Sequence, residues 1–155
     1  TWDEEAAELA TTLANTCEYE HKLLYDKQGK RMGQNLYRKM SSQQTDARST
    51  FNLWMKDMVK GWFDEVKKYT FGSSFNKYTG HYSQIVWAKT SKLGCGYSYF
   101  KTYHKKKLWN AGYLVCNYKP AGNMKGKNPY EEGFGNCETD KFRRSTKYNN
   151  LCVTK

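Results

Sequence analysis

Five cysteines constrain more than any other feature what this chain can fold into. They stand at positions 17, 95, 116, 137 and 152, and no two are spaced as Cys-x-x-Cys or grouped with histidine as in a zinc finger. A structural metal site is therefore not expected. In a chain rich in lysine and tyrosine, cysteines used in this way indicate disulfide bonds and a secreted protein. Because the count is odd, one cysteine is left over.

The composition is that of a basic chain of one-domain size. Its 155 residues include 16% aromatic residues, which can supply a packed core while their polar tips stay in water. Lysine and arginine number 26 against 15 acidic residues, a net charge of +11, which favours a sulfated glycan, an anionic lipid head group or a nucleic acid as partner. No nucleic-acid-binding fold signature accompanies this charge, so we expect no nucleic acid partner. No apolar run is long enough for a transmembrane segment.

Apolar periodicity predicts three helices. Residues 3–19 carry apolar side chains three and four positions apart, and residues 50–69 form the clearest amphipathic helix, with Thr50 as its N-cap. A shorter helix is expected over residues 81–90. Residues 34–40 could form a short edge element, and the polar segments between these elements are expected to be loops.

Two strand-like runs follow the third helix. Residues 95–103 and 113–118 have the composition of strands, and residues 104–110 would form the turn of a hairpin between them. Cys95 lies on one run and Cys116 on the other, so this pair could be bridged.

The C-terminal segment differs from the rest of the chain. From Pro120 onward it is rich in glycine and asparagine and shows little periodicity. Cys137 and Cys152 enclose a basic loop there, which is typical of a small tail closed by its own disulfide. Such a bridge acts mainly by removing freedom from the unfolded chain.

Two segments carry a resemblance to a known family. Residues 80–87 (Gly-His-Tyr-Ser-Gln-Ile-Val-Trp) and 113–123 (Tyr-Leu-Val-Cys-Asn-Tyr-Lys-Pro-Ala-Gly-Asn) resemble the signature segments of the CAP superfamily. This superfamily includes cysteine-rich secretory proteins, antigen-five venom allergens and plant pathogenesis-related proteins. Trp2-Asp3 with residues 14–17, and residues 33–36, are similar to two further family segments. The resemblance is closest to secreted invertebrate antigen-five or venom-allergen-like proteins of saliva, venom or parasites.

The resemblance implies an α+β fold, in which a small antiparallel sheet lies between helical layers as an α-β-α sandwich. It assigns residues 1–123 to a CAP domain and residues 124–155 to a C-terminal extension that contains cysteines. The CAP domain is expected to be N-terminally incomplete, because antigen-five proteins usually have an arm and a first helix before the segment that matches Trp2.

The family also implies a cysteine pairing. Its cysteine at the position of Cys17 pairs within the N-terminal arm, so Cys17 is expected to be unpaired in this chain. The expected bridges are then Cys95–Cys116 and Cys137–Cys152. A buried free thiol at Cys17 is the alternative explanation of the odd count.

A central cleft with two histidines and two acidic residues is a further implication of the family. The matching positions are His21, Gln34, Glu65 and His81, and Gln34 departs from the glutamate of many members. His21, His81 and Glu65 could hold Zn²⁺ or Cu²⁺, with Gln34 as an outer partner and without the fold requiring the metal. The same groups could form a general acid–base pair, or Glu65 and His81 could simply join two helices. No catalytic nucleophile is identifiable, and Ser83 is only a candidate.

The first of three functions that stay open is a secreted, non-enzymatic effector that binds a small hydrophobic ligand, a sterol or a fatty acid. Some family members bind sterols through an aromatic loop before the Gly-His segment, and others hold fatty acids or eicosanoids between helices. Here that loop offers Tyr69, Phe71, Phe75 and Tyr78 as an apolar rim. Its spacing departs from the family's sterol-loop pattern, because three residues rather than four separate Phe71 from Phe75.

The other two functions depend on charge and on metal. Lys105, Lys106 and Lys107 form a local peak of positive charge, which favours binding of heparin-like sulfated glycans or of a host protein in haemostasis or immunity. A metal-dependent enzyme, redox with copper or hydrolytic with zinc, is the third.

Overall fold

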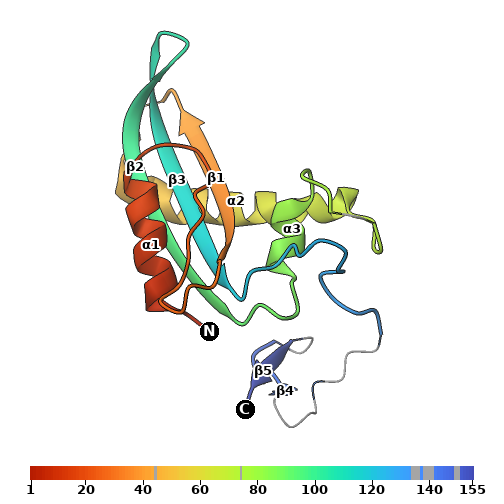
Figure 1. The fold of residues 1–155 in the computed structure, drawn as a ribbon. Coiled ribbons are helices and arrows are strands. Elements are labelled where there is room, and N and C mark those ends of the chain that lie inside the picture. The colour runs from red at the N-terminus through yellow and green to blue at the C-terminus, as the bar shows by residue number, and fades with distance from the viewer. Residues whose placement is uncertain (44, 74, 134–136, 138–141, 149–150) are drawn as a thin grey trace.

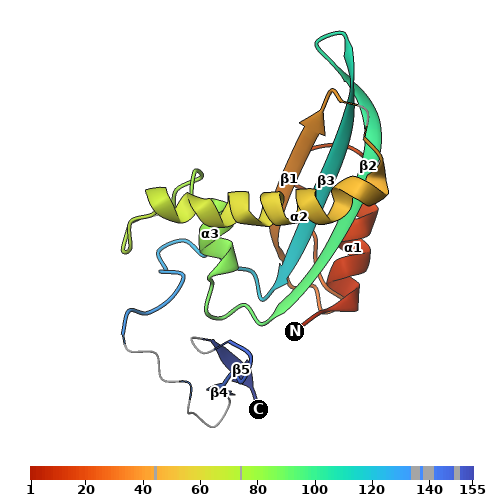
Figure 2. The same cartoon turned by 180° about the vertical axis from the view of Figure 1, so that it is seen from behind.

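The fold is an antiparallel sheet covered by helices on both faces. It is seen in a computed structural model that describes residues 1–43, 45–73, 75–133, 137, 142–148 and 151–155. Three strands, β1 (Gly33–Ser41), β2 (Lys92–His104) and β3 (Lys107–Lys119), pair in the order β1-β3-β2. Helix α1 (Glu4–Asn15) covers one face, and α2 (Ala47–Asp64) with α3 (Gly80–Ile85) covers the other (Figure 1, Figure 2). The expected α-β-α sandwich is confirmed.

The central strand β3 supplies side chains to both faces, because successive residues of a strand point to opposite sides. Tyr113 and Val115 pack with α1, whereas Leu114 and Cys116 pack with Trp54, Met58 and Trp62 of α2. A run from Asn110 to Tyr118 is therefore buried without interruption. β1 is an edge strand, as residues 34–40 predict.

Helix α1 is shorter than the sequence predicts. Asp3 caps it by accepting a hydrogen bond from the Ala6 amide at 2.9 Å, and the helix ends at Asn15. Cys17 has a φ of 60°, which no α-helix continues through, so the expected helix over residues 3–19 stops early. Trp2 lies outside the helix and is 56% exposed.

Helix α2 begins earlier than predicted. Asp46 is its N-cap and accepts hydrogen bonds from the amides of Arg48 and Ser49, both at 2.9 Å. The expected cap at Thr50 is therefore wrong, because a carboxylate four residues upstream offers the stronger acceptor and Thr50 becomes a buried position of the first turn. After Asp64 the chain tightens into a 3₁₀ helix, η1 (Glu65–Lys68).

The two long strands, β2 and β3, stay paired up to a two-residue turn. Residues 104–110 were expected to form the turn, but His104 already pairs with Lys107. The turn consists of Lys105 and Lys106, whose φ angles of 49° and 63° match the two-residue turn that follows the twist of a hairpin. Likewise α3 ends at Ile85, short of the expected residue 90.

Both expected disulfides are present. Cys95 and Cys116 are directly opposite each other in β2 and β3, and Cys137 joins Cys152. Cys17 is a free cysteine, as expected. The C-terminal tail holds a small hairpin of β4 (Phe142–Arg144) and β5 (Cys152–Thr154), whereas the domain division at residue 123 stays a prediction. None of the helices in the described residues is long and apolar enough to cross a membrane.

Candidate functional site

Glu65 and His81 form the best-defined polar pair of the molecule. Glu65 begins η1, directly after α2, and His81 is the second residue of α3. The carboxylate accepts three hydrogen bonds: Oε1 from His81 Nδ1 at 2.7 Å, and Oε2 from the amides of His81 and Tyr82, each at 3.0 Å. It thus satisfies two of the otherwise unpaired amides at the start of α3. The pair joins two helices, which is one of the roles predicted for it.

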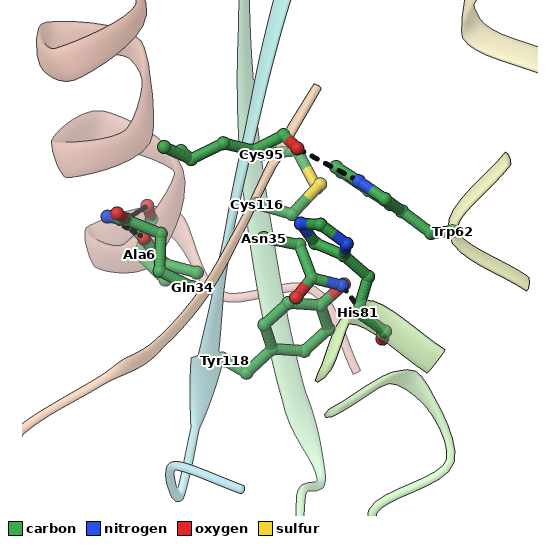
Figure 3. The surroundings of a disulfide bond; sticks show 10 residues. Ala6, Gln34, Asn35, Trp62, His81, Cys95, Cys116 and Tyr118 are labelled. Carbon is green, nitrogen blue, oxygen red and sulfur yellow. Dashed lines mark hydrogen bonds between the residues drawn. A yellow bond between two sulfur atoms is a disulfide. The ribbon is translucent and has the colours of Figure 1, made fainter. Parts of the chain in front are cut away.

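The surroundings of His81 fix the ring and its tautomer. An ionised carboxylate can only accept, so Nδ1 donates to Glu65, and in the neutral ring the lone pair is then on Nε2. The ring is stacked on Trp62, with centroids 6.0 Å apart and 19° between the planes. Buried Asn35 donates to the His81 carbonyl at 3.1 Å and lies 3.1 Å from the Tyr118 hydroxyl (Figure 3).

His21 and Gln34 form a second pair on the other face of the sheet. Gln34 Oε1 lies 2.9 Å from His21 Nδ1, and Gln34 Nε2 donates to Asn117 Oδ1 at 3.1 Å. Asn117 in turn donates to the Ala6 carbonyl of α1. Gln34 and Asn35 are neighbours on β1, so their side chains must point to opposite faces. In Figure 3, Gln34 lies beside Ala6, whereas His81 lies with Trp62 across the strands.

The four cleft positions therefore do not assemble as expected. His81 pairs with Glu65 and His21 pairs with Gln34, and across the described residues no group of three or more His, Cys, Asp or Glu side chains could hold a metal ion. Both oxygens of Glu65 are already occupied by N–H donors. The residues do not fit the expected three-ligand set of His21, Glu65 and His81.

Ser83 is built into the scaffold. Its Oγ lies 2.6 Å from Asn123 Oδ1 and 3.3 Å from the Gly80 carbonyl, and Asn123 Nδ2 donates to the same carbonyl at 2.8 Å. The hydroxyl thus locks α3 to the segment after β3. This contact involves neither His81 nor another base.

The aromatic loop before α3 lines a groove. The ring centroids of Phe71 and Tyr130 lie 5.3 Å apart. The ring of Tyr69 contacts those of Tyr82 and Tyr130, with centroid distances of 5.2 Å and 6.4 Å. The groove beside them encloses about 710 Å³. Its lining combines loop, helix end and the segment after β3: Phe71, Trp87, Ala88, Lys89, Lys127, Asn128, Pro129, Tyr130, Glu131 and Glu132.

The four expected rim residues separate into two kinds. Phe71 lines the groove, and the ring of Tyr69 contacts that of Tyr130, which lines the groove as well. Tyr69 and Phe75 also line a neighbouring pocket of only about 20 Å³, roughly the space of one water. Tyr78 is 67% exposed and lines neither hollow. Of the four expected residues, only Phe71 therefore lines the ligand-sized groove.

Sequence reasoning missed the far wall of this groove. Residues 127–132 have no periodicity that marks them as part of a site. Tertiary contacts place them there, since the Ala88 amide donates to the Pro129 carbonyl at 2.7 Å. Burial and then a hydrogen bond with Tyr130, a groove residue, raise the pKa of Tyr82 to about 12, so its hydroxyl stays neutral. The proline and tyrosine of 129–130 were the only available signal.

The three predicted glycan-binding lysines lie at the other end of the sheet. Lys105 and Lys106 form the hairpin turn and Lys107 begins β3, and all three are exposed. They are therefore separate from both the histidine pairs and the groove.

Comparisons with known proteins place these features in a family. The family model "CAP: Cysteine-rich secretory protein family" matches residues 1–118. "Salivary antigen-5" of Dipetalogaster maximus is 58% identical over 155 residues, which are 100% of this chain and 61% of that protein. "Venom allergen 5" of Vespa velutina is 39% identical over 133 residues, 84% of this chain and 61% of that protein. The chain thus spans about three fifths of the length of these relatives.

A solved structure agrees with the sequence matches. The crystal structure of NaASP2 with Zn²⁺ has a TM-score of 0.59 and 31% sequence identity, covering 86% of this chain and 66% of that one. Fold, disulfide pattern and sequence identity agree with the resemblance in the two signature segments. This chain belongs to the CAP, or cysteine-rich secretory protein, family and is similar to salivary antigen-5 and venom allergen 5.

Proposed function

We propose that this chain is a secreted, non-enzymatic CAP-domain protein that binds a small hydrophobic ligand, a fatty acid or a sterol, in the groove of Phe71 and Tyr130. The observation that carries the proposal is the groove itself. Its volume of about 710 Å³ lies within the range of small-molecule sites, and Phe71, Trp87 and Pro129 give it an apolar wall. The names of its salivary and venom relatives support secretion.

The charged residues of the groove indicate how an amphipathic ligand would be oriented. Lys89 and Lys127 line the same space as the aromatic rings, and an ammonium group is a suitable partner for a carboxylate. A fatty acid could place its chain against Phe71 and Tyr130 and its head group at a lysine. A sterol would use the apolar wall without needing the lysines.

The proposal is of a binding protein because, among the residues that the structure describes, Ser83 and Glu65 are both held in scaffold contacts and no hydrogen bond joins a serine to His81. Ser83 is hydrogen-bonded to Asn123. Glu65 accepts three N–H hydrogen bonds, which makes it an anchor for α3 and His81. Both groups serve the scaffold.

Calorimetric titration of oleic acid and of cholesterol into delipidated protein tests the proposal. Replacing both groove rings (Phe71→Ala with Tyr130→Ala) should weaken oleate binding by about tenfold or more, because each lost ring removes apolar contact area. Lys127→Met should weaken oleate and leave cholesterol unchanged. Tyr25→Ala, a ring that is 52% exposed elsewhere, is the matched control. The absence of saturable binding by the wild type, or equal affinities in the groove variants, would contradict the proposal.

Binding of Zn²⁺ or Cu²⁺ stays a prediction. The similarity to NaASP2, which was solved with Zn²⁺, supports it, and so does the use of Nδ1 rather than Nε2 in the contact between His81 and Glu65. The three N–H hydrogen bonds to its carboxylate argue against Glu65 as a ligand. Titration of either metal into the wild type and into His81→Ala decides the matter, since identical isotherms would dismiss a site at this histidine.

A further inference from the structure

The β2–β3 hairpin extends past the rest of the sheet. β1 ends at Ser41, which pairs with Asn110, so beyond that point β2 and β3 form a two-stranded ribbon. We call residues 101–110 the hairpin tip. In both views the tip projects beyond α1 and α2, at the end of the sheet away from α3 (Figure 1, Figure 2). None of the helices in the described part of the chain covers it.

Apolar side chains lie on both faces of the hairpin tip. Tyr103 and Leu108 are directly opposite each other, so they share one face, and they are 76% and 47% exposed. Trp109 pairs with Thr102 and therefore lies on the other face. Its Nε1 donates to the His104 carbonyl at 3.2 Å, which leaves the ring half-buried on the ribbon. Tyr103 and Leu108 thus form a small exposed apolar pair directly beside the lysines of the turn.

The charge of the hairpin has one sign. Residues 92–119 contain six lysines and no aspartate or glutamate. Two of the six, Lys92 and Lys119, are paired with acids of the α1 segment. The other four, at positions 101, 105, 106 and 107, form no ion pair with any residue in the described part of the chain. The turn positions also have positive φ, where Asn-Gly would be usual and lysine is uncommon.

We propose that the hairpin tip docks on the surface of an anionic lipid bilayer. Tyrosine and tryptophan rings partition to the membrane–water interface, where their apolar body and polar tip are both accommodated. Lysine stems can lie along apolar surface while the ammonium groups reach the lipid phosphates. The tip therefore has both components of peripheral membrane binding on one short ribbon.

A sulfated glycan fits the tip less well. It would use the lysines alone and would leave the exposed Tyr103 and Leu108 without a role. Charge complementarity and apolar exposure together favour the bilayer. This docking is also independent of the groove, because the two sites lie at opposite ends of the hairpin.

Cosedimentation of the whole chain with lipid vesicles tests the inference. Vesicles of phosphatidylcholine with about one third phosphatidylserine should bind the wild type, and pure phosphatidylcholine should not. Changing Lys105, Lys106 and Lys107 to Gln should weaken binding about 100-fold, because each lysine near an anionic surface contributes about fivefold. Tyr103→Ser with Leu108→Ser should weaken it about tenfold or more.

Matched controls change the same chemistry elsewhere. The triple change of Lys27, Lys30 and Lys56 to Gln removes the same charge from exposed positions, and Leu23→Ser with Tyr25→Ser removes side chains that are 65% and 52% exposed. Both should leave vesicle binding within about twofold, apart from a small uniform loss for the charge variant. The groove variant Phe71→Ala with Tyr130→Ala should also still bind vesicles, which separates this inference from the proposed function.

Three results would overturn the inference. One is equal binding to vesicles with and without phosphatidylserine. Another is a loss in the control variants as large as in the tip variants. The third is unchanged vesicle binding by the Tyr103/Leu108 variant together with loss of heparin retention by the lysine variant, which would make the tip a glycan site. Thermal unfolding of each variant checks that the tip changes leave the fold intact.

Discussion

At the scale of single residues, Glu65 organises more of the candidate site than any histidine does. One carboxylate fixes the His81 ring and two amides of α3, and it is 19% exposed, so water competes little for these bonds. Hydrogen bonds to a charged group are stronger than neutral ones, and unmet amides at a helix start are costly. The position and tautomer of His81 therefore depend on its neighbour.

We expect Glu65→Gln to destabilise the protein by about 2 kcal/mol. The glutamine side chain keeps one oxygen as acceptor, but its NH₂ group then faces an N–H donor and cannot accept a hydrogen bond from it. Urea unfolding of the variant measures the loss. Glu8→Gln, at an exposed position of α1, should stay within about 0.5 kcal/mol of wild type. A Glu65 variant as stable as this control would show that the three hydrogen bonds contribute nothing net.

At the scale of elements, α1 lies directly on β2 because two glycines allow it. A Cβ on Gly94 would lie 2.2 Å from the Ala7 amide nitrogen, and one on Gly96 would lie 2.3 Å from Thr11 Cα. These are backbone atoms of a helix, which cannot move aside singly. The close approach also lets Ser98 Oγ donate to the Ala14 carbonyl at 2.5 Å.

Gly96→Ala should therefore cost about 2–3 kcal/mol, because α1 must shift away from the sheet. The matched control is Gly80→Ala, whose added Cβ would lie 3.3 Å from the ring of Phe75, a side chain that is 59% exposed and can move. Chemical denaturation should show a clear loss for the first and a change below about 1 kcal/mol for the second. Equal effects would mean that α1 adjusts freely on β2.

At the scale of the whole molecule, a small charge cluster ties the first residues to the end of β3. Lys119 Nζ lies 3.1 Å from Asp3 Oδ1 and 2.8 Å from Glu5 Oε2. The Ala6 amide and then Lys119 hold the pKa of Asp3 below its ordinary 3.8. The hydrogen bond from Lys119 is the main cause that lowers the pKa of Glu5 from 4.5, and the same contacts raise the pKa of Lys119.

These directions fix how stability depends on pH. The two carboxyls have lower pKa values folded than unfolded, so their contribution is complete above about pH 5 and is lost as the pH falls through the folded values. The contribution of Lys119 is complete below its unfolded pKa and is lost as the pH rises through the folded one. The melting temperature of Lys119→Met should therefore fall less than that of the wild type as the pH is lowered from 6 to 3, as measured by thermal unfolding. Lys89→Met, at an exposed site, should follow the wild-type curve.

Much of the fold could be predicted from the sequence. The three helices, the two long strands and the edge strand all exist where local periodicity indicates them, although helix ends and the hairpin turn were misplaced. Ends depend on single capping groups such as Asp46, and turn length depends on strand pairing between β2 and β3, which local propensity does not report.

The sequence by itself predicted the three helices and the three strands of the main sheet, because these depend on local periodicity, and it predicted the cysteine pairing through the family resemblance carried by the signature segments. Only the tertiary structure decided which groups meet. Adjacent Gln34 and Asn35 point to opposite faces of β1, so one histidine pair belongs with α1 and the other with α2 and α3. The groove likewise needs the 127–132 segment to fold back beside Phe71. Only contacts between residues distant in the chain, such as Ala88 and Pro129, can specify this.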